Sequence, residues 1–299
     1  MKIFSVILSL LIFLTALPAG IDALEIGGTF NFENLRFDRD RAETEDSFSG
    51  ENYYWGVSVF ATHSFSEELA IKTGFYQDTI LRNVLYTTLN YNTQYLSLGV
   101  GPFFGFFNST STILKSGIST RVEFSLPGKI FASLGSDNSI GGRLVEEDDY
   151  IQEGSAIAFG FYVPNAICSL NLRNKKFTQK QATLETVDNL TEYAFDTEIF
   201  QKNLPYRVTL SFGYQTMEKK YIAAATTRHT LNSIILGAET RIALNRWLDL
   251  LVSLDSSIYT FGQNELAGVS NPGPWGYTFR SYTGCVVNLE RLKPESPPR

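Results

Sequence analysis

The chain has 299 residues and a formal net charge of −6, and 43% of its residues are hydrophobic and 14% aromatic. It has no basic patch of the kind that binds nucleic acid, and its two cysteines cannot build a disulfide framework. After the N-terminal segment, no run of about 18 apolar residues offers a transmembrane helix.

The N-terminal segment predicts export. Lys2 supplies a small positive charge, an apolar run covers 3–17, and small residues precede position 24. The apolar run is short and ends in small residues, which is typical of a secretory signal peptide and not of a transmembrane helix. Cleavage is expected after Ala23, with Ala19 or Gly20 as alternatives.

The rest of the chain alternates between apolar and polar residues, as strands with two unlike faces do. In 206–215, for example, the apolar Val208 and Leu210 alternate with Arg207 and Thr209. A helix would spread the charged residues over every side, so the helical interpretation fails. The sequence therefore predicts an all-β protein.

Fourteen strands are predicted in chain order. The pattern is weakest near 82–92 and 128–136, and the loss of one hairpin would leave twelve strands. An even number returns both ends of a barrel to one rim. The predicted strands lie near 26–37, 52–63, 69–78, 82–92, 94–107, 113–126, 128–136, 154–163, 166–176, 191–201, 205–216, 231–244, 247–261 and 275–291.

Short and long connections alternate between the predicted strands. This rhythm predicts an up-and-down antiparallel transmembrane β-barrel with tight periplasmic turns on one rim and extracellular loops on the other. The short connections are 64–67, 92–93, 126–128, 163–165, 203–205 and 245–246. The long ones include 38–51, 137–153, 176–190, 217–229 and 262–274.

Strand length and aromatic placement favour a membrane barrel over a soluble secreted β protein. The predicted strands average about ten residues or more, enough to cross a bilayer at the usual tilt, whereas strands of soluble proteins usually have about 5–6. Aromatic residues near both strand ends would form the two interfacial girdles. They are Tyr91, Tyr95, Tyr206 and Trp247 beside short turns, and Tyr53, Trp55, Tyr76, Tyr214, Trp275 and Tyr277 toward the long connections.

The C-terminal segment 283–289 resembles the assembly signal of outer-membrane barrels, with a polar residue, a glycine and spaced apolar positions. Val287 takes a place that is usually aromatic, and the chain continues beyond it. Together these features resemble the bacterial outer-membrane β-barrel proteins, porin-like in size. The resemblance implies a signal peptide at 1–23, a barrel over 24–292 and a Pro-rich tail at 293–299. Its implied partners are outer-membrane lipids and, during biogenesis, the barrel assembly machinery.

The polar faces of the strands carry nine basic and nine acidic residues. Arg or Lys exposed to hydrocarbon at the bilayer midplane costs about 2–4 kcal/mol, so the interior must be aqueous or paired. Either opposed charges line a pore, or they form a cross-lumen network with no channel. Eight strands leave room for side chains only and 16–18 leave an aqueous channel, so fourteen favour a modest pore. The predicted pore-lining residues are Lys72, Arg82, Lys115, Arg121, Glu123, Arg207, Glu239, Arg241, Asp255 and Arg280.

Other chemistry finds little support in the sequence. His63 and His229 are expected at opposite rims and cannot share a catalytic site, and no Gly-x-Ser-x-Gly elbow occurs, so no enzyme is expected. The acidic run 146–149 is interpreted as a solvated loop, and no metal or cofactor is expected. Cys168 and Cys285 are expected to face lipid on separate strands without a disulfide.

We therefore expect an outer-membrane channel for passive diffusion of small hydrophilic solutes through a charge-lined lumen. The six residues expected to set the field near mid-strand are Lys115, Arg121, Glu123, Glu239, Arg241 and Asp255. The alternative is a closed, surface-exposed barrel that acts in adhesion or structural interaction through its long extracellular loops.

Overall fold

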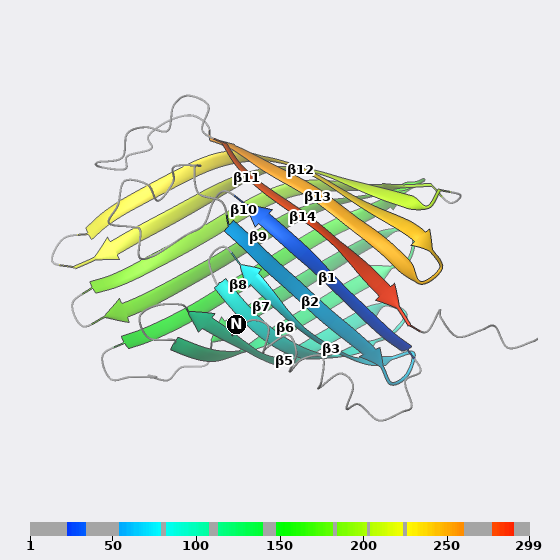
Figure 1. Cartoon of the computed structure of the whole chain (residues 1–299), viewed down its shortest axis with the longest axis horizontal. Helices are drawn as coiled ribbons and strands as arrows, with labels where there is room; N and C mark the ends of the chain where they lie inside the picture. Colours follow the sequence, from blue (N-terminus) through cyan, green and yellow to red (C-terminus); the bar gives the residue numbers. More distant parts are fainter. Residues whose placement is uncertain are drawn as a thin grey trace, which may run out of the picture.

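The protein forms one closed sheet of fourteen strands in a computed structural model (Figure 1). The structure describes residues 23–33, 54–78, 82–107, 113–139, 148–181, 184–201, 204–223, 226–259 and 277–289. None of these residues belongs to a helix long and apolar enough to cross a membrane. The predicted signal peptide and C-terminal tail lie outside the described residues, apart from Ala23.

The strands are β1 (Ala23–Glu33), β2 (Tyr54–Ser64), β3 (Leu69–Asp78), β4 (Arg82–Asn92), β5 (Leu96–Phe107), β6 (Ile113–Leu126), β7 (Ile130–Ser139), β8 (Asp148–Val163), β9 (Ala166–Gln181), β10 (Leu184–Phe200), β11 (Tyr206–Ile222), β12 (Thr226–Asn245), β13 (Leu248–Tyr259) and β14 (Tyr277–Asn288).

Each strand pairs antiparallel with its neighbours in the chain, and β1 closes the barrel against β14. The closing register pairs Glu25 with Asn288 and Glu33 with Arg280. The start of β1 therefore lies beside the end of β14, where Figure 1 shows the blue and red strands side by side. The prediction of a fourteen-strand, up-and-down barrel is confirmed, and the barrel begins and ends at one rim.

All six predicted short turns lie on that rim, which we call the turn rim. Between β6 and β7, the Lys129 N–H donates to the Leu126 carbonyl at 2.9 Å. Pro127 precedes Gly128, whose φ of 72° is the left-handed value that the third position of a type II turn requires. Asn165, with φ 64°, plays a similar part in the tight turn between β8 and β9.

On the opposite rim, which we call the loop rim, two predicted long connections are wrong. Residues 176–190 and 217–229 are mostly strand, because β9 and β10 are joined by 182–183 only, and β11 and β12 by 223–225. His229 accordingly lies in β12 and not in a loop. In the predicted loop 137–153, β7 continues to Ser139 and β8 begins at Asp148, so half of the acidic run is strand. The predicted loops 38–51 and 262–274 lie outside the described residues.

The register explains why the sequence pattern misses these strand ends. The outward side chains of Leu172, Tyr193, Tyr214 and Ile234 form one row across β9–β12. The next outward row toward the loop rim is polar: Asn174 donates to Thr191 at 2.9 Å and Thr216 to Asn232 at 3.0 Å. Beyond the tyrosine row the outward face is polar and the inward face mixes polar with apolar residues, so the alternation that reveals a membrane strand ends there.

These strand ends form a projection that we call the strand extension, comprising 174–181, 184–191, 216–222 and 226–232. A tilted crossing needs about 9–11 residues, and Tyr206 to Tyr214 of β11 already supplies them. The extension therefore lies outside the membrane-spanning part of the barrel. Its outward face holds ion pairs between Lys176 and Glu153 at 2.9 Å and between Lys220 and Glu218 at 2.6 Å.

Glu218 is buried, and it also pairs with Arg228. Burial raises the pKa of its carboxyl group, but the hydrogen bonds and charges of Lys220 and Arg228 outweigh burial and hold that pKa below its ordinary value. A carboxyl group whose pKa is depressed by folding stabilises the fold at pH values above its pKa in the unfolded chain, about 4.3. This contribution is lost as the pH falls through the pKa of the folded state.

We expect Glu218→Gln to speed amide exchange in 216–230 at pH 7, and the difference from the wild-type protein to shrink below about pH 4. Exchange rates are compared with the wild type at each pH, so intrinsic pH effects cancel. Glu153→Gln is the control, because its partner Lys176 and Glu153 itself are both about half exposed, and such pairs contribute little. Equal effects of the two changes would contradict the prediction.

Candidate functional site

The outer face of the barrel is a continuous apolar surface. Large apolar side chains at alternate positions are widely exposed, including Leu170 at 61% and Phe212 at 59%. In β11 the exposed residues Tyr206, Leu210 and Tyr214 share one parity and place aromatic rings at both ends of an apolar stretch. A water-soluble protein rarely exposes apolar surface on this scale, whereas a closed, girdled barrel in lipid requires it. This is the architecture of an outer-membrane β-barrel.

The inner face of this barrel carries the charges. Across β10–β13 the register sets Glu198 beside Thr209, Thr209 beside Glu239, and Glu239 beside Ser253. One inward row nearer the turn rim, Arg207 lies directly opposite Arg241. Successive strands therefore bring like and unlike charges together on one wall of the lumen.

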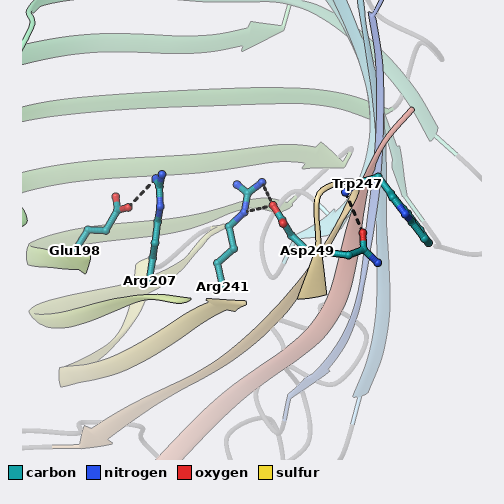
Figure 2. A network of polar contacts seen from close by, with 6 residues as sticks. Glu198, Arg207, Arg241, Trp247 and Asp249 are labelled. Atoms are coloured by element: carbon teal, nitrogen blue, oxygen red, sulfur yellow. Dashed lines mark hydrogen bonds and ion pairs between the residues drawn. The ribbon is translucent and has the colours of Figure 1, made fainter. Parts of the chain in front are cut away.

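The two opposed arginines are each neutralised by an acid on the next strand (Figure 2). Arg207 donates through Nη1 to Glu198 at 3.3 Å, and Arg241 donates to one Asp249 oxygen through Nε at 2.8 Å and Nη2 at 2.5 Å. The order across the wall is acid, base, base, acid. This arrangement prevents the repulsion that two unpaired guanidinium groups in direct cross-strand contact would produce.

A second group of charges lies on other strands of the wall. Arg121 and Glu123 of β6 pair at 2.9 Å, and Arg173 of β9 pairs with Glu192 of β10 at 3.3 Å. The side chain of Arg121 is 67% exposed and that of Arg207 is 63% exposed, although both face the inside of a closed barrel. The surrounding side chains therefore leave both guanidinium groups largely uncovered.

Small residues surround Arg121. The inward row that contains it continues through Gly99 on one side and through Gly135 and Ala156 on the other, before reaching Arg173. None of these three neighbours has a side chain that could fill the lumen. Arg121 and Arg173 thus belong to one inward row and are separated by two strands that contribute only Gly135 and Ala156 to it.

Eight of the ten predicted pore-lining residues have described side chains, and all eight belong to the inward parity of their strands. Lys72 lies over the Phe60 ring at 4.8 Å from its centroid. Glu239 accepts a hydrogen bond from the Tyr282 hydroxyl, and Asp255 pairs in register with Arg280. The eight are Lys72, Arg121, Glu123, Arg207, Glu239, Arg241, Asp255 and Arg280. The side chains of Arg82 and Lys115 lie outside the described residues.

The depth predicted for Arg241 is wrong. We expected it near mid-strand, but it lies four residues before the end of β12 at Asn245, close to the turn rim. The predicted strand 231–244 already placed Arg241 three residues from its turn-rim end, which the structure puts at Asn245, so the error lies in the depth assigned to Arg241 and not in the strand boundary.

Sequence reasoning missed several inward acids, so the predicted balance of nine charges of each sign is not found among described side chains. Glu192 has the same parity as Asp196 in β10, so strand alternation alone could have identified it as inward. The other missed acids lie at strand ends that the sequence predicted too short. The missed acids are Glu25, Asp137, Asp188 and Glu192. Described inward bases are Lys72, Arg121, Arg173, Lys175, Arg207, Arg241 and Arg280. Described inward acids are Glu25, Glu123, Asp137, Asp188, Glu192, Asp196, Glu198, Glu239, Asp249 and Asp255.

An apolar group on the inward face near the loop rim was also missed. Phe177 is 2% exposed, and Leu190, Met217 and Ile235 are buried as well. Their strands lie side by side from β9 to β12. Except for Ile235, these residues fall in stretches that the sequence predicted as loops, so no face could be assigned to them. The wall of the lumen is therefore polar toward the turn rim and partly apolar toward the loop rim.

Within the described residues, no three His, Cys, Asp or Glu side chains are grouped so that they could hold a metal ion. His63 lies at the turn-rim end of β2 and packs edge-on against Phe65, with ring centroids 4.7 Å apart. Cys168 and Cys285 lie on β9 and β14 and are free thiols. Their predicted location on separate strands is confirmed.

No protein-family model matches the sequence, and no curated protein matches it. Solved structures with a similar fold include OmpT, an outer membrane protein of Vibrio cholerae, at 9% identity over 91% of this chain and 99% of that chain, with a TM-score of 0.42. An anion-selective porin from Comamonas acidovorans is 9% identical over 89% of this chain and 98% of that chain, with a TM-score of 0.41. An outer membrane channel from Pseudomonas putida F1 is 8% identical over 91% of this chain and 98% of that chain, with a TM-score of 0.48.

Proposed function

We propose that the protein is a porin-like channel of the bacterial outer membrane and that small hydrophilic solutes diffuse passively through its lumen. In this proposal the protein reaches the outer membrane after signal-peptide-directed export. The observation that carries the proposal is the exposure of inward guanidinium groups. Arg121 and Arg207 are each more than half exposed inside a closed barrel. A lumen filled by its own side chains would bury such groups.

The mechanism is passive flow through a water-filled path with a charged wall. Paired arginines and acids fix the wall geometry, since each guanidinium is held by a neighbouring carboxylate. The resulting local fields orient polar solutes. No catalytic step and no cofactor is proposed, and the solutes are the small polar molecules that fit the open section near Arg121 and Gly135.

Planar-bilayer recording of the purified, refolded protein tests the proposal, and we expect stepwise increases in conductance. Ala156→Trp should lower the size of the step, because Ala156 belongs to the inward row beside Arg173. Ile157→Trp is the matched control, because the adjacent residue faces outward and is 48% exposed. Absence of steps in the wild-type protein would refute the channel.

One observation favours the alternative of a closed surface barrel. Phe177, Leu190 and Met217 are buried on the inward side near the loop rim, where an open mouth would expose them. In that case the protein would act in adhesion or structural interaction through its extracellular loops. Deletion of 262–274 that abolishes partner binding and leaves membrane permeability unchanged would support this alternative.

A further inference from the structure

The outward face of β8–β12 changes its chemistry in register order from apolar to polar to charged. Two apolar rows cross these strands, followed toward the loop rim by a row of small polar residues and then by charged residues. The first apolar row is Phe159, Leu170, Phe195, Phe212 and Leu236, and the second is Ile157, Leu172, Tyr193, Tyr214 and Ile234.

A groove of about 630 Å³ follows the two apolar rows. Its walls come from β8 to β12 and include Leu170, Tyr193, Phe212 and Tyr214, all of them strongly exposed. The volume falls within the range of about 300–1,000 Å³ that is typical of sites for small molecules. Because the groove lies on the lipid-facing side of the barrel, its natural occupant is an acyl chain.

Directly beyond the groove, residues of the polar row hydrogen-bond to one another and to the next row. Asn174 donates to Asn189 at 3.0 Å and to Thr191 at 2.9 Å, and Thr216 donates to Asn232 at 3.0 Å. These groups mark the level at which the apolar region ends.

The next two rows carry a cationic group above the groove, which we call the cationic trio: Glu218, Lys220 and Arg228. The single carboxylate of Glu218 is shared by both cations, so the trio has a net charge of +1. The side chain of Arg228 is 60% exposed and that of Lys220 37% exposed. Lys176 lies in the same region but is neutralised by Glu153.

The spacing suits one amphiphile. Lys176 and Glu218 lie two rows, and Lys220 and Arg228 three rows, beyond the Tyr193–Tyr214 row. At about 6.6 Å per row along a strand and a strand tilt of 35–45°, this is about 10–15 Å along the membrane normal. Long cationic side chains reach back toward the interface, which brings their charges to the height of a lipid headgroup.

We propose that this face binds an anionic lipid, with an acyl chain in the groove and a phosphate-bearing headgroup on the cationic trio. The site is on the outside of the barrel and does not depend on the lumen being open. Charge complementarity selects the headgroup, and the groove selects the chain. A zwitterionic lipid has no net attraction to the trio, so it should bind less tightly.

Native mass spectrometry of the intact protein in detergent tests the headgroup. A diacyl phosphatidylglycerol is compared with a diacyl phosphatidylcholine of the same chains, and we expect the first to bind several-fold more tightly. Arg228→Gln should reduce that preference about fivefold, the effect of one basic residue near an anionic surface. Lys129→Gln, at an exposed turn-rim position, is the matched control and should change nothing.

Fluorescence quenching tests the groove. Phe212→Trp places a reporter in the groove, and Phe124→Trp places one at an exposed outward position of β6 away from it. Phosphatidylglycerol with brominated acyl chains should quench the added emission more strongly at 212 than at 124. The proposal would be overturned if the protein bound the two lipids with equal affinity. It would also be overturned if the Lys129 and Arg228 variants lost the preference for phosphatidylglycerol equally, or if both reporters were quenched equally.

Discussion

Replacing Leu210 with arginine is expected to destabilise the barrel by about 2–4 kcal/mol, the cost of a basic side chain at the midplane of a lipid-facing strand. Leu210 lies midway between the girdle residues Tyr206 and Tyr214 of β11 and is 48% exposed on the outer face. No water is available there to solvate a guanidinium group. The change therefore reports directly on which face meets lipid.

The same substitution at the adjacent residue should be close to neutral. Thr209 faces inward, and its register partners on the two neighbouring strands are Glu198 and Glu239. An arginine at 209 would enter a water-accessible wall between two carboxylates, which favour a positive charge.

The free energy of unfolding of both variants can be measured by denaturant titration of the protein in liposomes under conditions of reversible folding. A cost at 209 equal to or larger than that at 210 would contradict the assignment of the two faces. A large cost at 210 alone would support both the apolar exterior and the aqueous interior.

Replacing Gly284 with alanine is expected to destabilise the closure of the barrel by about 3 kcal/mol or more, the upper range for overpacking. Gly284 lies in β14 opposite Thr29 of β1, at the seam between the first and last strands. A Cβ atom there would lie 2.1 Å from the Gly28 carbonyl oxygen and 2.8 Å from the Thr29 Cα. Both are backbone atoms, so the strands themselves must move apart.

Gly135→Ala is the matched control, because the nearest atoms to an added Cβ in β7 are 3.8 Å away. Glycine in a strand is less favourable than alanine by about 0.5–1 kcal/mol, so this change should be neutral or slightly stabilising. Electrophoresis of unheated samples separates the compact barrel from the unfolded chain. A compact Gly284→Ala barrel with wild-type unfolding behaviour would show that the seam tolerates the methyl group.

Much of the membrane-spanning part follows from local sequence. In β6, the predicted range 113–126 agrees with the structure, because one apolar and one polar face alternate over its whole length. The turn at Pro127 and Gly128 is equally local, since proline fixes one backbone angle and glycine allows the positive φ of the next position. In contrast, residues 176–181 and 217–222 show no apolar outward face, so local alternation does not reveal them as strand, whereas in the structure they pair with neighbouring strands.

The candidate site divides in the same way. Parity alone places Arg121, Arg207 and Glu239 on the inward face, because side chains of a strand alternate strictly between its two faces. Parity does not say which charges meet. The pairing of Arg241 with Asp249 and of Arg207 with Glu198 depends on the register between strands, and so does the distance of each pair from the rim.

By itself, the sequence determined the class of the protein and the face on which most residues of a membrane strand lie, and it favoured fourteen strands over twelve. The reason is that hydrophobic alternation and turn chemistry act over only a few residues. The tertiary structure decided the closing seam at Gly284, the ion pairs of the lumen wall, the strand extension and the groove beneath Arg228. These features join residues on different strands, and their geometry follows from register and closure, which no single segment contains.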